Sequence, residues 1–149
     1  AGIVAAADIA IAVESARFGF TEVKLGLIPA VISPLVMARI GYGHASRYFL
    51  TGEVFDAEEA RRIGLVQNTA ASLAELDDAV LGIVRHICAS SPAATRDAKA
   101  LIAGISKQQP GDPGQRDYVA GEIARIRVSG LGQEGLRSFL HKERPAWTK

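Results

Sequence analysis

The chain has 149 residues, of which 48% are hydrophobic, 22% charged and 6% aromatic, which is typical of one folded domain rather than of a disordered segment. Its 17 Lys and Arg residues against 16 Asp and Glu residues give a net charge of +1. Because these charges form neither a basic stripe nor an acidic tail, we expect no nucleic-acid partner.

The chain opens on an apolar run, residues 1–7, without an initiator methionine. The run is not typical of a signal peptide, since no basic segment precedes it and Asp8 follows it directly. It is also far shorter than the ~20 apolar residues of a membrane span, so we expect no membrane partner. We interpret the run as the middle of a buried element that an unnatural N-terminus interrupts.

Two short strands are predicted next. Residues 9–13 form an apolar run suited to a buried strand. After a turn, the alternation of Phe18 and Phe20 predicts a second strand that ends near Glu22. Residues 25–29 contain Gly and Pro and are expected to form a loop.

Two helices are expected after this loop. Ser33, followed by a proline, is suited to cap the first helix, which should end near Gly41 or Gly43. The second helix is predicted over residues 44–50 and should stop at Gly52.

A further capping pair marks a short helix before another strand. Asp56 and Glu59 have capping-box spacing, and the helix they start should end at Gly64. The apolar pair Leu65 and Val66 then predicts the start of a strand.

The second half of the chain is predicted to be helical. Ser72 and Glu75 repeat the capping device, and Ser91 and Asp112, each followed by a proline, start two further helices, the latter running to about Val128. Each of the first two helices carries an apolar stripe: Leu73, Leu76, Val80, Ile83, Val84 and Ile87, then Ala98, Leu101, Ile102 and Ile105.

A loop and a break separate the last helices. Residues 108–113 are expected to form the loop, and residues 130–132 the break. A final amphipathic helix should end at Pro145. The natural division therefore falls near residue 70, between a mixed α/β part, residues 1–71, and an all-helical part, residues 72–149.

Few standard motifs are present. The single cysteine, Cys88, excludes an intramolecular disulfide and a cysteine-based zinc cluster, and it fits a reducing compartment, so we expect a cytoplasmic protein. Residues 41–46 only half match a dinucleotide fingerprint. The histidines are far apart, without an obvious partner, and we expect surface or packing roles for His44, His86 and His141. No metal site is indicated.

Glu22 is the one carboxylate that stands out. It ends an aromatic strand and precedes a loop rich in Gly and Pro, so it is expected to be partly desolvated, which favours a group that takes up and releases protons. Most glutamates at strand ends are solvated or paired, and by this reasoning alone that simpler interpretation is favoured.

Residues 8–12, DIAIA, followed by residues 16–29, ARFGFTEVKLGLIP, resemble the signature of the enoyl-CoA hydratase/isomerase (crotonase) family. Further stretches resemble the family in order, so that the resemblance covers essentially the whole chain: residues 50–53, 57–60, 64–66, 133–136, 139–142 and 144–147. The resemblance implies an α/β fold, in which residues 1–71 are the C-terminal part of the crotonase (ClpP-like) spiral core. Residues 72–149 would be the all-helical trimerisation region, so that a homo-trimer or hexamer is expected.

The resemblance also implies roles for individual residues. Glu22 matches the second of the family's two catalytic glutamates, which moves a proton to or from the α-carbon or the attacking water. Ala30 falls where a glycine usually helps to hold that water through its backbone N–H. Phe139 and Lys142 match residues that contact the nucleotide end of CoA, often across a subunit boundary, although a core Phe and a solvated Lys remain open alternatives.

Two departures from the family pattern bear on the reaction. The first catalytic glutamate falls on Gly2, which cannot transfer a proton, and residues 30–34 replace the usual Gly-rich loop. Residues 26–34 resemble the branch with methylglutaconyl-type and carboxygeranoyl-type hydratases, which act on branched acyl-CoAs. A single glutamate at Glu22 also fits the enoyl-CoA isomerase branch.

The resemblance therefore implies a lyase that adds water across the double bond of a 2-enoyl-CoA thioester, through an enolate held in an oxyanion hole. No cofactor is expected, since coenzyme A is part of the substrate. The two backbone donors of the oxyanion hole are expected upstream of Ala1, and losing one such donor costs about 10²–10³ in rate. The chain is thus expected to be an inactive fragment by itself, and the alternatives are an isomerase or a purely structural, oligomer-forming product.

Overall fold

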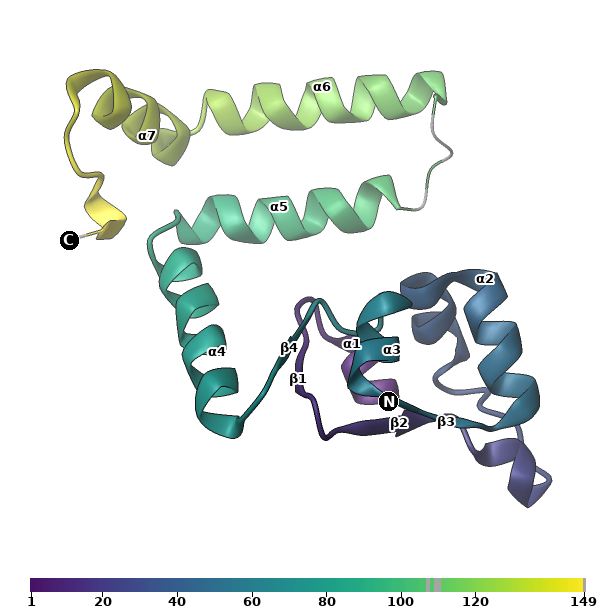
Figure 1. Cartoon of the computed structure of the whole chain (residues 1–149). Coiled ribbons are helices and arrows are strands. Elements are labelled where there is room, and N and C mark those ends of the chain that lie inside the picture. Colours follow the sequence, from purple (N-terminus) through teal and green to yellow (C-terminus); the bar gives the residue numbers. More distant parts are fainter. Residues whose placement is uncertain (107, 109–110, 149) are drawn as a thin grey trace. The chain divides into compact units, whose positions relative to one another are not determined.

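The computed structural model describes residues 1–106, 108 and 111–148, and the chain divides into two compact units, Ala1–Leu81 and Gly82–Lys149. Figure 1 labels the helices and strands. The first unit contains α1 (Gly2–Ala6), β1 (Ile11–Val13), β2 (Arg17–Gly19), η1 (Glu22–Leu25), α2 (Ser33–Thr51), β3 (Val54–Asp56), α3 (Ala57–Arg62), β4 (Asn68–Ala70) and the start of α4 (Leu73–Cys88). The second unit contains the end of α4, then α5 (Pro92–Ile105), α6 (Pro113–Arg127), α7 (Gly130–His141) and η2 (Ala146–Thr148).

The strands of the first unit form two pairs. β1 runs parallel to β4, and β2 runs antiparallel to β3 with Phe18 opposite Phe55. The strand predicted at Leu65 and Val66 is wrong, because β4 begins at Asn68. The backbone N–H groups of Leu65 and Val66 both donate to the carbonyl of Ala60, so these residues enter the core in a turn that follows α3.

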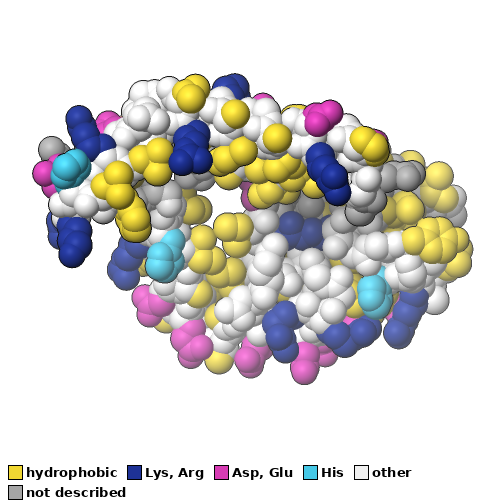
Figure 2. Space-filling view, turned by 90° about the horizontal axis from the view of Figure 1, so that it is seen from above, with side chains coloured by type: hydrophobic (Ala, Val, Ile, Leu, Met, Phe, Trp, Pro, Cys, Tyr) yellow, Lys and Arg dark blue, Asp and Glu magenta, His cyan; other side chains and the backbone are white. Residues whose placement is uncertain are grey.

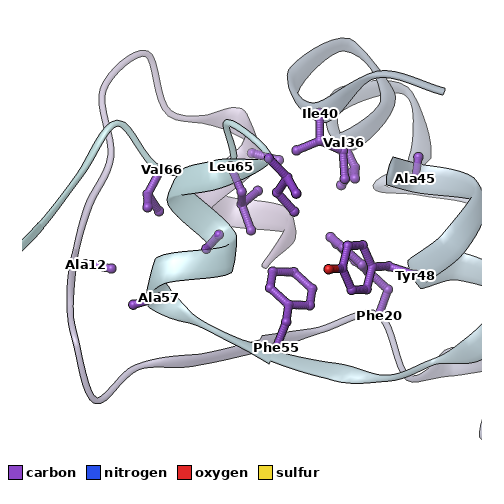
Figure 3. Packing of buried hydrophobic residues seen from close by; sticks show 13 residues of the cluster. Ala12, Phe20, Val36, Ile40, Ala45, Tyr48, Phe55, Ala57, Leu65 and Val66 are labelled. Atoms are coloured by element: carbon purple, nitrogen blue, oxygen red, sulfur yellow. The ribbon is translucent and has the colours of Figure 1, made fainter. Parts of the chain in front are cut away.

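An aromatic cluster forms the centre of this unit. The ring centroids of Tyr48 and Phe55 are 4.3 Å apart, and those of Phe20 and Phe49 are 5.1 Å apart with the rings edge to face. Figure 3 shows Tyr48 and Phe55 next to one another, with Val36 of α2 above Tyr48 in that view. Phe20 is fully buried two residues before Glu22, so the core anchors the chain directly ahead of that carboxylate.

The predicted helix pair corresponds to α2, which is broken at Gly41. This residue has φ 74° and ψ 168°, and α2 ends in a left-handed conformation at Gly52, as expected for glycine. The predicted cap is wrong, since Ile32 precedes the first helical residue and Ser33 lies inside α2. The Ser33 hydroxyl donates instead to the carbonyl of Ala30 at 2.9 Å.

Most of the other helix starts are confirmed. The side chains of Asp56, Ser91 and Asp112 each accept a backbone N–H of the first helical turn. The predicted break at residues 130–132 is wrong, because Ser129 caps α7 and these residues form its first turn. α7 also ends before Pro145, at a left-handed residue 142. The loop expected over residues 108–113 includes residues 109–110, which lie outside the described residues.

The helices after β4 leave much apolar surface open. No described residue of α4, α5 or α6 is buried, and four of the six residues in the stripe predicted on α4 are exposed, by 40% to 72%. Figure 2 shows hydrophobic side chains gathered in several clusters, while acidic and basic side chains lie close together along the lower edge of that view. Among the described helices, none has the length and hydropathy that a membrane span requires.

Candidate active site

Glu22 is the first residue of η1, not the end of a strand as predicted. β2 stops at Gly19 because its partner β3 begins at Val54, which is paired with Gly19, and the chain then turns through Phe20 and Thr21. Glu22 is half-buried, and its Oε2 atom is shielded from solvent without a hydrogen-bond partner among the described residues. A shielded carboxylate oxygen without a partner is costly, so this atom is suited to receive a hydrogen bond from a bound molecule.

The turn after Glu22 holds the short helix in place. The backbone N–H groups of Gly26 and Leu27 both donate to the Glu22 carbonyl, and Gly26 has the positive φ of 73° that this turn requires. These bonds constrain the backbone of Glu22 through its carbonyl group and do not involve its carboxylate.

η1 also packs closely on the end of α2. A Cβ atom added at Gly52 would lie 3.0 Å from Val23 Cγ2 and 3.2 Å from Lys24 Cε. The absence of a side chain at residue 52 therefore permits the close approach that sets the position of η1. Sequence reasoning identified Gly52 only as a helix stop, because its second contact joins residues far apart along the chain.

Ala30 lies in the loop between η1 and α2, three residues before α2 begins at Ser33. Its N–H donates to the carbonyl of Ile28 at 2.8 Å, and its own carbonyl accepts the Ser33 hydroxyl. The structure thus brings Glu22 and Ala30 onto one short segment. The N–H that the resemblance assigns to water is, in this structure, bonded within the loop.

Gly2, at the position of the expected first glutamate, opens α1 and faces the side chain of Ile32. Sequence reasoning noted the unusual loop over residues 30–34 but did not connect it with Gly2. The sequence offered one signal, the β-branched Ile32 in a normally Gly-rich loop. That signal does not reveal that Ile32 faces Gly2.

Phe139 and Lys142 lie together at the C-terminal end of α7, in the second unit. The Lys142 N–H donates to the Phe139 carbonyl at 3.2 Å and the Glu143 N–H to the Ser138 carbonyl, which together make a Schellman-type turn. In this single chain Phe139 is 81% exposed, and Lys142 is exposed as well. Glu22 and Ala30 belong to the first unit.

A second half-buried carboxylate, Glu59, has full hydrogen bonding. It accepts the Tyr48 hydroxyl and both Nε and Nη2 of Arg62, the latter at 2.6 Å. These bonds, with that from Arg62 first, lower the pKa of Glu59 to about 2. Burial and the bond to Glu59 raise the pKa of Tyr48 to about 12. Sequence reasoning missed this cluster, whose groups are paired with one another and are suited to a structural role.

This chain is similar to known proteins along nearly its whole length. A family model described as enoyl-CoA hydratase/isomerase matches residues 1–149. A solved structure from Legionella pneumophila, named for enoyl-CoA hydratase/isomerase (crotonase), is 45% identical with a TM-score of 0.89 and covers 98% of this chain and 56% of its own.

Two curated relatives are named for different reactions, one as a hydratase and one as an isomerase. A mevalonyl-coenzyme A hydratase of Beauveria bassiana is 32% identical over 95% of this chain and 51% of its own length. A peroxisomal Δ(3,5)-Δ(2,4)-dienoyl-CoA isomerase of Arabidopsis thaliana is 30% identical over 99% of this chain and 52% of its own length. The chain thus spans about half the length of the curated relatives it matches.

Proposed function

The chain belongs to the enoyl-CoA hydratase/isomerase family and has the α/β crotonase fold, and from this premise we propose that Glu22 is the general acid–base of a hydratase. The reaction would add water across the double bond of a 2-enoyl-CoA thioester. The observation that carries the proposal is the shielded Oε2 atom of Glu22, which has no partner among the described residues. A general base needs such a free oxygen within reach of the proton it takes.

The proposed mechanism uses one carboxylate twice. Glu22 takes a proton from water while the water oxygen forms a bond to the β-carbon, and the electrons of the double bond move into the thioester as an enolate. The protonated Glu22 then delivers that proton to the α-carbon, which gives the 3-hydroxyacyl thioester and restores the carboxylate. The negative charge on the enolate oxygen is the main species to stabilise.

The remaining groups belong to the same proposal. Ala30 would contribute its N–H to the attacking water only by sharing the bond that it now makes to Ile28. Phe139 and Lys142 would meet the nucleotide end of CoA, which their exposure supports. Residues 26–34 support a branched acyl chain through their resemblance to branched-acyl hydratases. No metal or redox cofactor is proposed, because the reaction moves only protons and water.

The activity is proposed for the full-length protein. The resemblance assigns both oxyanion donors to residues outside these 149 positions. The exposed apolar stripes after β4 support a homo-trimer or hexamer, in which Phe139 would reach a neighbouring subunit's substrate.

An isomerase is the second candidate. Gly2 stands in place of the first of the two glutamates, and an isomerase needs only one base, which would take a proton from C2 of a 3-enoyl-CoA and return it at C4. The relative named as a dienoyl-CoA isomerase supports this alternative. The two reactions differ in whether water enters the product.

The test is Glu22→Gln in the full-length protein, with Glu14→Gln as the control at an exposed position of the same unit. Glu22→Gln should lower kcat by roughly 10²–10⁴ while acyl-CoA binding is retained, because the amide cannot transfer the proton. Loss of the conjugated thioester absorbance measures hydration, and conversion of 3-enoyl-CoA to 2-enoyl-CoA measures isomerisation. Wild-type turnover in Glu22→Gln would remove Glu22 from the mechanism, and turnover of 3-enoyl-CoA alone would favour the isomerase.

A further inference from the structure

Two residues that depart from the family's usual pattern touch one another in the structure. Gly2 opens α1, and a Cβ atom added there would lie 3.2 Å from Ile32 Cβ and 3.7 Å from Ile32 Cδ1, and closer still to Ile32 Cγ2. α1 and α2, both labelled in Figure 1, pack against each other in the first unit. Ile32 lies directly before α2.

Ile32 cannot easily move away from residue 2. Its side chain is half-buried and packs against the hydrophobic core of the unit. The nearest atom, Cγ2, is a branch methyl attached to Cβ, and β-branched side chains have few χ1 rotamers. The backbone is held as well, because the Ser33 N–H donates to Pro29 and the Val36 N–H donates to the Ile32 carbonyl. A side chain at residue 2 would therefore overpack a constrained site.

Ile32 is also close along the chain to the proposed base. The segment from Glu22 to Ile32 is tied by the bond from the Leu27 N–H to the Glu22 carbonyl and by that from Ser33 to Pro29. The same short loop thus carries the shielded carboxylate at one end and the apolar side chain that fills the space beside Gly2 at the other.

We propose that Gly2 and Ile32 form a complementary pair, in which the Ile32 side chain fills the space that a carboxylate at residue 2 would need, so that among the described residues Glu22 supplies the carboxylate of the proposed site. The Ile32 side chain then keeps the space beside Gly2 apolar, whereas a charged group at residue 2 would need solvent or a partner. The inference rests on the proposed function for the role of Glu22, but the packing of the pair can be tested independently of it.

The experiment is a double-mutant cycle in the full-length protein with the variants Gly2→Glu, Ile32→Ala and the two combined. Gly2→Glu should lower the Tm by roughly 5 °C or more, because it forces a side chain into the space of Ile32. Adding Ile32→Ala to Gly2→Glu should recover much of that loss, since the smaller side chain leaves room. Val31→Ala, at the exposed neighbouring position, is the matched control and should recover none of it.

The steady-state kcat and KM of the wild type, Ile32→Ala and the combined variant give a readout besides stability. The combined variant should recover the Tm while its kcat differs from that of the wild type and of Ile32→Ala, because it carries a carboxylate at residue 2. The proposed packing of Gly2 against Ile32 would be overturned if Gly2→Glu left the Tm unchanged, or if adding Ile32→Ala did not restore the Tm. A rescued Tm with no turnover of any enoyl-CoA by the wild type would keep the pair and instead reject the proposed function.

Discussion

At the residue scale, two half-buried glutamates of the first unit have opposite surroundings. Glu59 is bonded to Tyr48 and Arg62, whereas Glu22 has an oxygen shielded from solvent and unpaired among the described residues. Paired buried carboxylates stabilise a fold, and an unpaired one is retained at a cost that a bound ligand can offset. This contrast, rather than burial, distinguishes the candidate catalytic residue from the structural one.

The pairing of Glu59 has a consequence for acid stability. Its pKa is lowered from 4.5 to about 2, so the carboxylate stabilises the fold above pH 4.5 and this contribution is lost as the pH falls toward 2. Glu59→Gln should lower the Tm at pH 7 by roughly 3–8 °C, because hydrogen bonds to the charged group are lost. The Tm of the full-length wild type and variant, measured at several pH values from 7 down to 2, checks this difference.

The difference between wild type and Glu59→Gln should shrink as the pH falls from 4.5 toward 2. Glu58→Gln, on the exposed side of the same short helix, is the control and should change the Tm little. A constant Tm difference at every pH would show that the carboxylate charge does not contribute.

At the element scale, the position of the short helix η1 depends on its contact with the end of α2. Gly52 ends α2 with φ 59° and lies against Val23 and Lys24 of η1. One glycine therefore meets two demands, a left-handed backbone and a close approach between elements. Because η1 begins with Glu22, its contact with α2 sets where the carboxylate lies.

Gly52→Ala is expected to impair both stability and catalysis. The left-handed conformation costs an alanine about 1–2 kcal/mol, and the added Cβ would push η1 away from α2. A shift of the catalytic group of this kind can lower kcat by about 10²-fold. Thermal unfolding and steady-state kinetics of the full-length protein measure the two effects.

The matched control is Gly43→Ala in the same helix, where an added Cβ would meet nothing within 4 Å. It should be neutral, or stabilising by up to about 1 kcal/mol, since alanine favours helix. A Gly52→Ala variant with a lower Tm but wild-type kcat would show that η1 keeps its position without this contact.

At the scale of the whole molecule, the chain leaves large apolar side chains open to solvent. On α4 and α7 these exposed residues are Leu73, Val80, Leu81, Val84, Ile87, Leu131, Leu136, Phe139 and Leu140. Monomeric proteins rarely expose apolar residues in such numbers on adjacent turns of a helix. The proposed homo-oligomer would cover them, which is consistent with helices that have amphipathic sequences but no buried residue on α4.

A charge on this surface should weaken the proposed oligomer. Leu140→Glu places a carboxylate on the apolar side of α7, and we expect the trimer or hexamer to dissociate at micromolar concentration because an unpaired charge cannot be buried. Size-exclusion chromatography with light scattering on the full-length protein measures the mass. Gln133→Glu adds the same charge at an exposed polar position of α7 and should leave the mass unchanged. A monomeric wild type would contradict the proposal.

Local features of this fold could be predicted from the sequence. The caps at Asp56, Ser91 and Asp112 and the break at Gly41 depend on residues within about one helical turn, so the chain itself contains the information. The place of Glu22 between an aromatic segment and a Gly- and Pro-containing loop drew attention to it, but only the resemblance to the family favoured a catalytic role over a solvated or paired one.

Other features depend on contacts between distant parts of the chain. The start of β4 at Asn68 is set by its pairing with β1, and the Tyr48 to Glu59 bond joins two helices. The sequence by itself determined the family and the helix starts at Asp56, Ser91 and Asp112, and its resemblance to the family pointed to Glu22 as the candidate base, because these follow from local residue order. Only the tertiary structure decided that the Glu22 oxygen is shielded and unpartnered and that Ile32 fills the space beside Gly2, because shielding and filled space arise from packing between elements.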